Sequence, residues 1–226
     1  MSAPNTRRWV IIIVKGTVTI SLIWFVLSEI DLSESLHQLH GLSFKGVAGF
    51  LLLLALQALI GVWRWTFVIK LFGQPLPFFA ALRLYFEGLF FNQALPSTIG
   101  GDAVRMYRCT RIGMPVGAAI NGVLLDRVGG VGGLLILVGF CQPLAWQRLH
   151  ELGPRIAFAF ILMAGITAIA VLIAMASLPK HWCRWRFVEG LVELSSGARR
   201  MCLSPTIIIP VIGLAMAVHI ITVLAV

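Results

Sequence analysis

The sequence predicts an all-α fold: a polytopic transmembrane helix bundle with about five spans and one re-entrant helix. Of its 226 residues, 59% are hydrophobic and 12% are charged, whereas soluble domains are about half apolar and a quarter charged. The apolar residues gather in runs of roughly 20, the length that crosses a bilayer. Lysines and arginines fall in short groups between the runs, as they do in cytoplasmic loops of membrane proteins. Lipid must therefore cover part of this chain.

Five runs have the length and composition of a span. They cover residues 9–27, 44–72, 115–141, 156–178 and 205–226. The first follows Arg7 and Arg8 and is not followed by the small residues of a cleavage site, so we expect an uncleaved signal anchor. The last is still apolar where the chain stops. We therefore expect a single membrane domain over residues 1–226, truncated at its carboxyl end.

The charges between the runs indicate the orientation. With the amino terminus in the cytoplasm, thirteen lysines and arginines flank the spans on the inside and three on the outside. The inner set is Arg7, Arg8, Lys15, Lys70, Arg83, Arg105, Arg108, Arg111, Lys180, Arg184, Arg186, Arg199 and Arg200, and the outer set is Lys45, Arg148 and Arg155. Positive loops remain cytoplasmic. We expect an inner (cytoplasmic) membrane protein with a cytoplasmic amino terminus.

Residues 76–95 form a further apolar run. Whether this run crosses the membrane decides how many lysines and arginines lie on each side. If the run spanned fully, Arg105, Arg108 and Arg111 would move outside and the later loops would invert. Keeping both of its ends inside satisfies the charge rule better. The run is therefore predicted to be re-entrant, with a tip that is buried in protein or lines a cavity. A full span is the alternative.

Polar side chains of this run suit a cavity better than lipid. They are Arg83, Glu87, Asn92 and Gln93. Arg83 and Glu87 are spaced i,i+4, so they can pair on one helix face.

The next stretch predicts a break and a new helix start. Pro96 ends the preceding helix, and Gly100 and Gly101 allow the backbone to approach a partner closely. Asp102 is a good N-cap for a short helix that runs through Arg111. Residues 97–113 are expected on the cytoplasmic side.

Two arginines of this short helix point to an anionic ligand. Arg105 and Arg108 are spaced i,i+3 and share a face, and a helix start presents free N–H groups suited to phosphate. We expect this region to prefer anionic phospholipid headgroups. A tight turn with a cap and ordinary cytoplasmic arginines explains the pattern equally well.

Asp126 and Arg127 lie near the middle of the span 115–141. A charge at the bilayer centre costs about 2.5–3.5 kcal/mol on insertion scales, and such residues are functional by default. Both side chains are expected to be shielded from lipid and to face a cavity; a structural ion pair is the alternative. Partners are expected among Arg83, Glu87, Asn92 and Gln93. Arg64, near the inner end of its span, is explained by snorkelling to the headgroups.

The remaining patterns argue against other classes of protein. Gly129-x-x-x-Gly133 predicts a close contact between membrane helices. The four cysteines lack the spacing of a zinc site, so we expect no metal, no cofactor and no disulfide framework. Although the net charge is +9, no zinc-finger, RRM or helix-turn-helix pattern accompanies it, and we expect no nucleic-acid partner.

Together, several motifs resemble the lysylphosphatidylglycerol synthase transmembrane family, also called flippase-like membrane proteins. The resemblance rests on the segment FFNQALP at 90–96, Gly-Gly-Asp at 100–102, Arg105, Arg-Ile-Gly at 111–113, and the pair Asp126-Arg127. The family usually has Glu-Arg at the last position; Asp126 keeps the charge on a shorter arm. The specific part covers residues 83–133.

The resemblance implies a helical membrane domain that handles lipids. In some members it moves aminoacylated phospholipid between leaflets and a soluble aminoacyltransferase domain follows. That domain has no counterpart within residues 1–226, so we do not expect the synthase activity here and assign no catalytic residue. The family usually has more helices than the sequence predicts here, in keeping with a truncated chain.

Two classes of function follow. The first is a flippase-like protein that binds or translocates a phospholipid, glycophospholipid or other lipid-linked substrate. The second is a membrane subunit or enzyme of lipid or glycan modification, either a transferase or a scaffold for a separate synthase or glycosyltransferase partner. The sequence shows no dedicated catalytic triad, which favours the first.

Overall fold

The computed structural model describes residues 43–94, 99–148, 152–177 and 186–225, together with residues 16, 17, 20, 21, 24 and 25. Every regular element in these ranges is a helix. Contacts divide the chain into two compact units, Met1–Gly49 and Phe50–Val226. The site described below lies in the second unit. In the first unit, the Ser43 hydroxyl accepts a hydrogen bond from the Gly46 N–H at 3.0 Å, which is the geometry of a helix N-cap.

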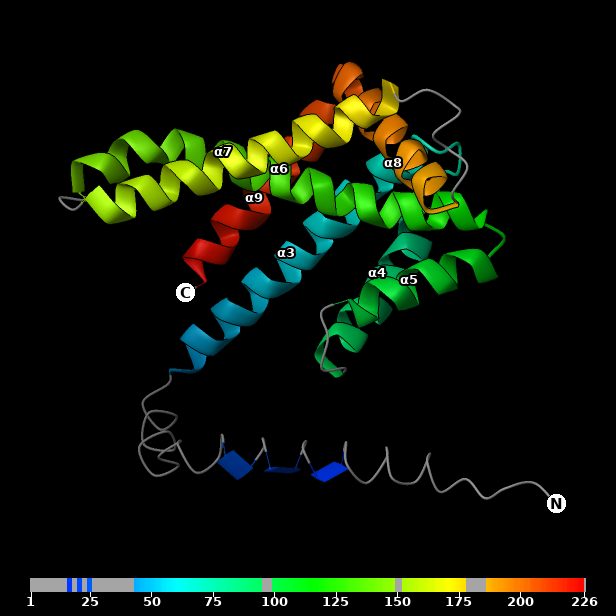
Figure 1. Ribbon diagram of the computed structural model, residues 1–226. Coiled ribbons are helices and arrows are strands. Elements are labelled where there is room, and N and C mark those ends of the chain that lie inside the picture. Colours follow the sequence, from blue (N-terminus) through cyan, green and yellow to red (C-terminus); the bar gives the residue numbers. More distant parts are fainter. Residues whose placement is uncertain are drawn as a thin grey trace. The chain divides into compact units, whose positions relative to one another are not determined.

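The helices follow one another with short connections (Figure 1). They are α3 (Phe44–Lys70), α4 (Phe78–Ala94), α5 (Gly100–Arg111), α6 (Val116–Arg148), α7 (Leu152–Ala174), a 3-10 turn (Met175–Ser177), α8 (Arg186–Leu203) and α9 (Pro205–Leu224). Among the described residues, four stretches are long and apolar enough to cross a membrane: Phe44–Lys70, Val116–Leu144, Leu152–Ser177 and Pro205–Leu224. They confirm four of the five spans expected from the sequence. The fifth, at 9–27, lies largely outside the described residues.

Helices α4 and α5 lie side by side as a hairpin (Figure 1). At 1.5 Å per residue, their 17 and 12 residues extend about 25 Å and 18 Å. Ile69, at the end of α3, shares a buried cluster with Met114 and Ala119, beside the start of α6. The hairpin therefore returns the chain to the end of the bundle that it left. The hairpin comprises both helices and is longer than the segment 76–95 for which the sequence predicted a re-entrant path.

Glycines allow the two hairpin helices to approach closely. A Cβ at Gly101 would overlap the carbonyl oxygen of Gly88 on the facing helix. The Gly101 N–H donates a hydrogen bond to Asn92 Oδ1 at 2.9 Å. Backbone proximity and this amide fix the register of α5 against α4.

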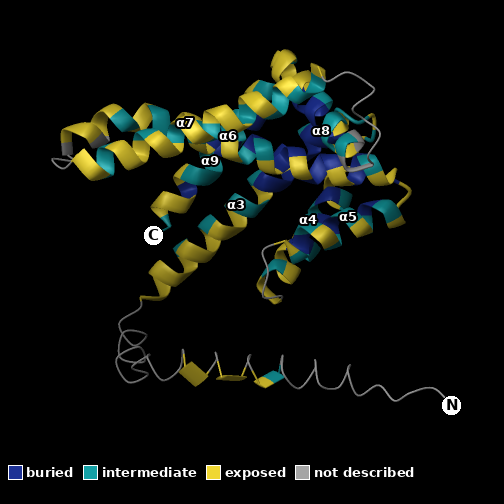
Figure 2. Cartoon of the chain, viewed as in Figure 1, coloured by how far each residue is buried: buried dark blue, intermediate teal, exposed yellow. Residues whose placement is uncertain are grey.

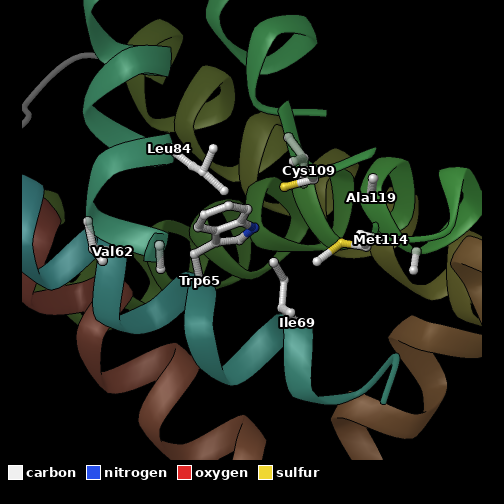
Figure 3. Packing of buried hydrophobic residues seen from close by; sticks show 10 residues of the cluster. Val62, Trp65, Ile69, Leu84, Cys109, Met114 and Ala119 are labelled. Carbon is white, nitrogen blue, oxygen red and sulfur yellow. The ribbon is translucent and has the colours of Figure 1, made fainter. Parts of the chain in front are cut away.

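Trp65 joins the hairpin to the rest of the unit. Its side chain is fully buried in a cluster with Leu84 of α4, Cys109 of α5 and Ala119 of α6. Figure 3 shows the indole at the centre of these side chains. Burying an aromatic ring of this size contributes more than any smaller side chain in the cluster.

A second buried cluster joins α3, α6, α8 and α9. It contains Val68, Leu125, Leu194, Ala198 and Val211. Helix α8 is amphipathic: its residues Leu194, Ala198 and Met201 are buried, while Arg199 and Arg200 are exposed. The helix begins at Arg186 and ends at Leu203.

The seam between α6 and α9 depends on small residues. A Cβ at Gly129 would lie 2.7 Å from Val211 Cγ1, and one at Gly133 would overlap Ala215. This confirms that the Gly129-x-x-x-Gly133 pattern marks a helix contact.

Buried residues concentrate where α3, α6, α8 and the hairpin meet (Figure 2). Helix α7 has no buried residue. An apolar helix with so little protein cover requires lipid around it.

Candidate functional site

Asp126 is the centre of a buried ionic cluster. Helix α6 holds it at 2% exposure. Its Oδ1 accepts a hydrogen bond from Arg64 Nε of α3 at 2.8 Å, and its Oδ2 accepts one from Arg105 Nη2 of α5 at 3.4 Å. Arg64 and Arg105 are themselves 8% and 5% exposed. One carboxylate thus links three helices and partly neutralises two buried guanidinium groups.

The Arg105 side chain is packed against two aromatic rings and a glycine. Its guanidinium carbon lies 4.2 Å from the centre of the Trp65 ring and 4.7 Å from that of Tyr85. A Cβ at Gly88 would lie 2.9 Å from Arg105 Cδ, so the glycine leaves room for the arginine stem. Aromatic faces attract a cation, most strongly when water is excluded. These contacts fix the position of Arg105 more firmly than its long contact with Asp126 does.

Two buried donors in this region have no acceptor among the described residues. They are the Arg105 Nε–H and the Trp65 indole N–H. Most buried polar groups in proteins are hydrogen-bonded, and an exception calls for an explanation. Arg105 is therefore under-bonded, although its position is fixed.

Asp102 and Arg127 form a second ion pair beside the first. Arg127 Nε and Nη2 lie 2.8 Å and 2.7 Å from the same atom, Asp102 Oδ2. Asp102 Oδ1 lies 3.8 Å from Arg105 Nη1. The Arg127 side chain is 54% exposed and the Asp102 side chain 13%. The outer pair is thus partly open to the surroundings, unlike the pair around Asp126.

Asp102 does not cap α5 as the sequence predicted. The helix begins at Gly100, with Ile99 at the cap position and no side-chain cap hydrogen bond. Asp102 lies inside the first turn, where a negative charge is favoured by the helix dipole. Its carboxylate instead binds Arg127. The predicted end of the helix at Arg111 is confirmed.

These side chains line a polar cavity of about 180 Å³. The lining residues are Arg64, Tyr85, Gly88, Leu89, Asn92, Asp102, Arg105, Asp126 and Arg127. Three guanidinium groups against two carboxylates leave a formal charge of +1. The cavity combines fixed positive charge with donors that have spare capacity, so chemically it suits an anionic group.

A separate ionic cluster holds the hairpin together on its outer side. Arg108 of α5 donates to both carboxylate oxygens of Glu87 on α4, at 2.7 Å and 2.8 Å. Arg83 donates to Glu87 at 3.1 Å, which confirms the predicted i,i+4 pair. The hydrogen bonds from Arg108 lower the pKa of Glu87 below its ordinary value. None of these three side chains lines the cavity.

The predicted partners of Asp126 and Arg127 were wrong. None of the four candidates on the hairpin pairs with them; Asp126 binds Arg64 and Arg105, and Arg127 binds Asp102. Both residues do pair with another helix, as expected; Asp126 is buried, whereas the Arg127 side chain is 54% exposed. Arg64 does not snorkel, because its guanidinium turns inward to the carboxylate. The observed partners lie 21, 25 and 62 residues away in sequence, so separation along the chain does not distinguish them from the predicted ones.

The other predicted site residues divide between the two clusters. Asn92 reaches the cavity, Gln93 is exposed and Gly100 is the first residue of α5. Pro96 lies outside the described residues. Arg105 and Arg108 both turn towards α4 but into different clusters.

Arg64, Trp65 and Tyr85 were not predicted as site residues. A usable signal existed only for Arg64, since a charged residue within a span is a candidate site in its own right. Among the described residues, no group of three or more His, Cys, Asp or Glu side chains could hold a metal ion.

Apolar helices around a buried, charged cavity define an integral membrane protein. The chain belongs to the family described as "Lysylphosphatidylglycerol synthase TM region", whose family model matches residues 12–226. Membership indicates an integral membrane protein with a role in lipid metabolism or of flippase-like type. Comparison with curated proteins and with solved structures gives no match.

Proposed function

We propose that this protein binds a phospholipid, a glycophospholipid or another lipid-linked substrate and carries its headgroup between leaflets. The observation that supports this most strongly is the polar cavity among helices that otherwise expose apolar side chains. A headgroup that leaves water loses its hydration, at a cost of several kcal/mol for a charged group. Fixed guanidinium, carboxylate and amide groups inside the bundle replace part of that hydration.

The partners in this proposal are the membrane lipids themselves, above all those with anionic headgroups. Three of the five charged groups of the cavity are arginines, and arginine recognises phosphate through its planar set of donors. Asp102 is the partner of Arg127 while the cavity holds no lipid.

Lipid movement in reconstituted vesicles tests the proposal. Vesicles with the purified chain receive a fluorescent phospholipid, and a membrane-impermeant reductant then reports how much reaches the outer leaflet. We expect faster movement than in protein-free vesicles. Arg127→Gln should slow this movement, because the cavity loses one of its three guanidinium groups. The variant leaves the buried Arg64–Asp126 pair intact, so the protein should still fold. Arg83→Gln, on the 75% exposed side chain of the hairpin cluster, is the matched control. Movement no faster than in empty vesicles would contradict the proposal.

We also propose an inner-membrane location with the amino terminus in the cytoplasm. Helix α3 ends and helix α6 begins at the same end of the second unit. This end carries Lys70, Arg111 and Arg200, and the basic ends of membrane proteins face the cytoplasm. Single cysteines at positions 70 and 148, in a cysteine-free background, test this. An impermeant maleimide added to intact cells should label position 148 and leave position 70 unlabelled; the reverse would invert the topology.

A further inference from the structure

We propose that Arg105 and Arg127 form a receptor for one phosphodiester monoanion, which takes the place of Asp102 on Arg127. This inference rests on the proposed function. It goes further by naming the chemical group that is bound and the two side chains that bind it.

Charge in the cavity favours a single negative charge. Its formal charge of +1, from three arginines and two aspartates, is neutralised by a phosphodiester. A phosphomonoester carries about −1.5 to −2 at pH 7, so it would leave excess charge in a partly buried space. Buried charge without a partner is strongly unfavourable.

Arg105 supplies the fixed half of the receptor. It is 5% exposed and lines the cavity, and its Nε–H has no acceptor among the described residues. Its contacts with the two aspartates, at 3.4 Å and 3.8 Å, are longer than those of a well-formed charged hydrogen bond. The aromatic rings and Gly88, and not the carboxylates, hold it in place. An incoming oxygen that reaches the Arg105 Nη groups therefore competes only with these long contacts.

Arg127 supplies the exchangeable half. Both of its short contacts go to one oxygen, Asp102 Oδ2, and 54% of its side chain is exposed. A half-exposed ion pair is held weakly compared with a buried one. A phosphate oxygen would replace Asp102 as the partner of Arg127. The released Asp102 carboxylate would stay beside Arg105, so that Arg105 would contact both the carboxylate and the phosphate.

The position of Arg127 indicates where the anion comes from. Arg127 lies in the candidate span Val116–Leu144. It is eleven residues from Val116, which is about 17 Å along the helix at 1.5 Å per residue. The hydrocarbon core is about 30 Å thick, so a core that begins at Val116 places this exposed charge about halfway through it. Leu89, the other exposed lining residue in the described region, is apolar. The cavity therefore opens beside Arg127 and Leu89 towards the membrane interior. Such an opening admits a phosphodiester that belongs to a membrane lipid and not one dissolved in water.

The cavity volume limits what enters. At about 30 Å³ for each water, 180 Å³ holds about six waters. A phosphate group fits, while the glycerol and the remainder of the headgroup stay at the mouth. Recognition should therefore follow the phosphate.

Native mass spectrometry of the full chain in detergent tests this with three probes. The probes are phosphatidylglycerol, a diacylglycerol with the same acyl chains, and phosphatidic acid; glycerophosphoglycerol serves as a soluble competitor. We expect saturable binding of phosphatidylglycerol, weaker binding of phosphatidic acid, none of diacylglycerol, and no displacement by the competitor. Arg105→Gln and Arg127→Gln should each weaken phosphatidylglycerol binding at least tenfold. Arg83→Gln, outside the cavity, should leave it unchanged.

The outcomes separate this inference from the proposed function. If the unmodified chain binds phosphatidylglycerol no better than diacylglycerol, both fail. If it prefers phosphatidylglycerol but the two glutamine variants bind equally well, only the receptor is overturned. Tighter binding of phosphatidic acid refutes the single-charge argument, and displacement by glycerophosphoglycerol refutes the lipid source. Thermal unfolding checks that the variants fold; where Arg105→Gln does not, Arg105→Lys, which keeps the charge and loses the planar donors, takes its place.

Discussion

Replacing Asp126 by asparagine should destabilise the protein strongly. The variant keeps the side-chain volume and removes the charge that Arg64 and Arg105 share. Arg105 keeps Asp102 at 3.8 Å, whereas Arg64, 8% exposed, loses the carboxylate 2.8 Å away. One buried charge without its counter-ion costs about 3–5 kcal/mol. We expect the free energy of unfolding to fall by that amount.

The folded fraction of the protein in mixed micelles, titrated with a denaturing detergent, measures this change. Glu87→Gln makes the same carboxylate-to-amide exchange in the hairpin cluster, where Arg83 is mostly exposed, and should cost far less. The double variant Arg64→Gln/Asp126→Asn removes the unpaired charge as well and should recover part of the loss. A loss below about 1 kcal/mol in Asp126→Asn, or simple additivity in the double variant, would refute the argument.

Three further predictions concern close packing and a buried thiol. Gly101→Ala should separate the hairpin helices, since a Cβ there overlaps α4, and lower the melting temperature measured by differential scanning fluorimetry. Gly133→Val should cost about 1–3 kcal/mol by overpacking against Ala215, while Gly139→Val, with nothing within 4 Å of its Cβ, should be near neutral; equal losses would show that the seam is not tight. Burial raises the pKa of the Cys109 thiol to about 11, so at pH 8 it should resist maleimide in the folded protein and react after unfolding, as read by mass spectrometry. Rapid labelling of the folded protein would mean that the hairpin opens readily.

The helices themselves were largely predictable from the sequence. Runs of about 20 apolar residues can satisfy their backbone in lipid only as helices, and four of them occur as such. Local patterns also held where both partners lie within a few residues. The Arg83–Glu87 pair forms at 3.1 Å, and the glycine spacing at Gly129 and Gly133 marks the contact with α9.

The candidate site was predicted only in part. Asp126 and Arg127 were singled out as charges that needed partners on another helix, because a charge in a membrane segment is costly, and both form such ion pairs. Which residue binds which was not predictable, since the ion pair between Arg64 and Asp126 joins positions 62 residues apart. An arginine near the end of a span can reach outward to headgroups or inward to a carboxylate, and sequence alone does not separate the two.

The sequence by itself determined that this chain is a helical membrane protein and that charges lie within its apolar segments. Only the tertiary structure decided that α4 and α5 form one hairpin, and that Arg105 packs against Trp65 and Tyr85 with its Nε–H lacking an acceptor among the described residues. Hydrophobic length and charge cost are properties of each segment, so they can be read along the chain. Ion pairing depends on the distance between side chains of different helices, which is set only when Gly88 and Gly101 let those helices pack together.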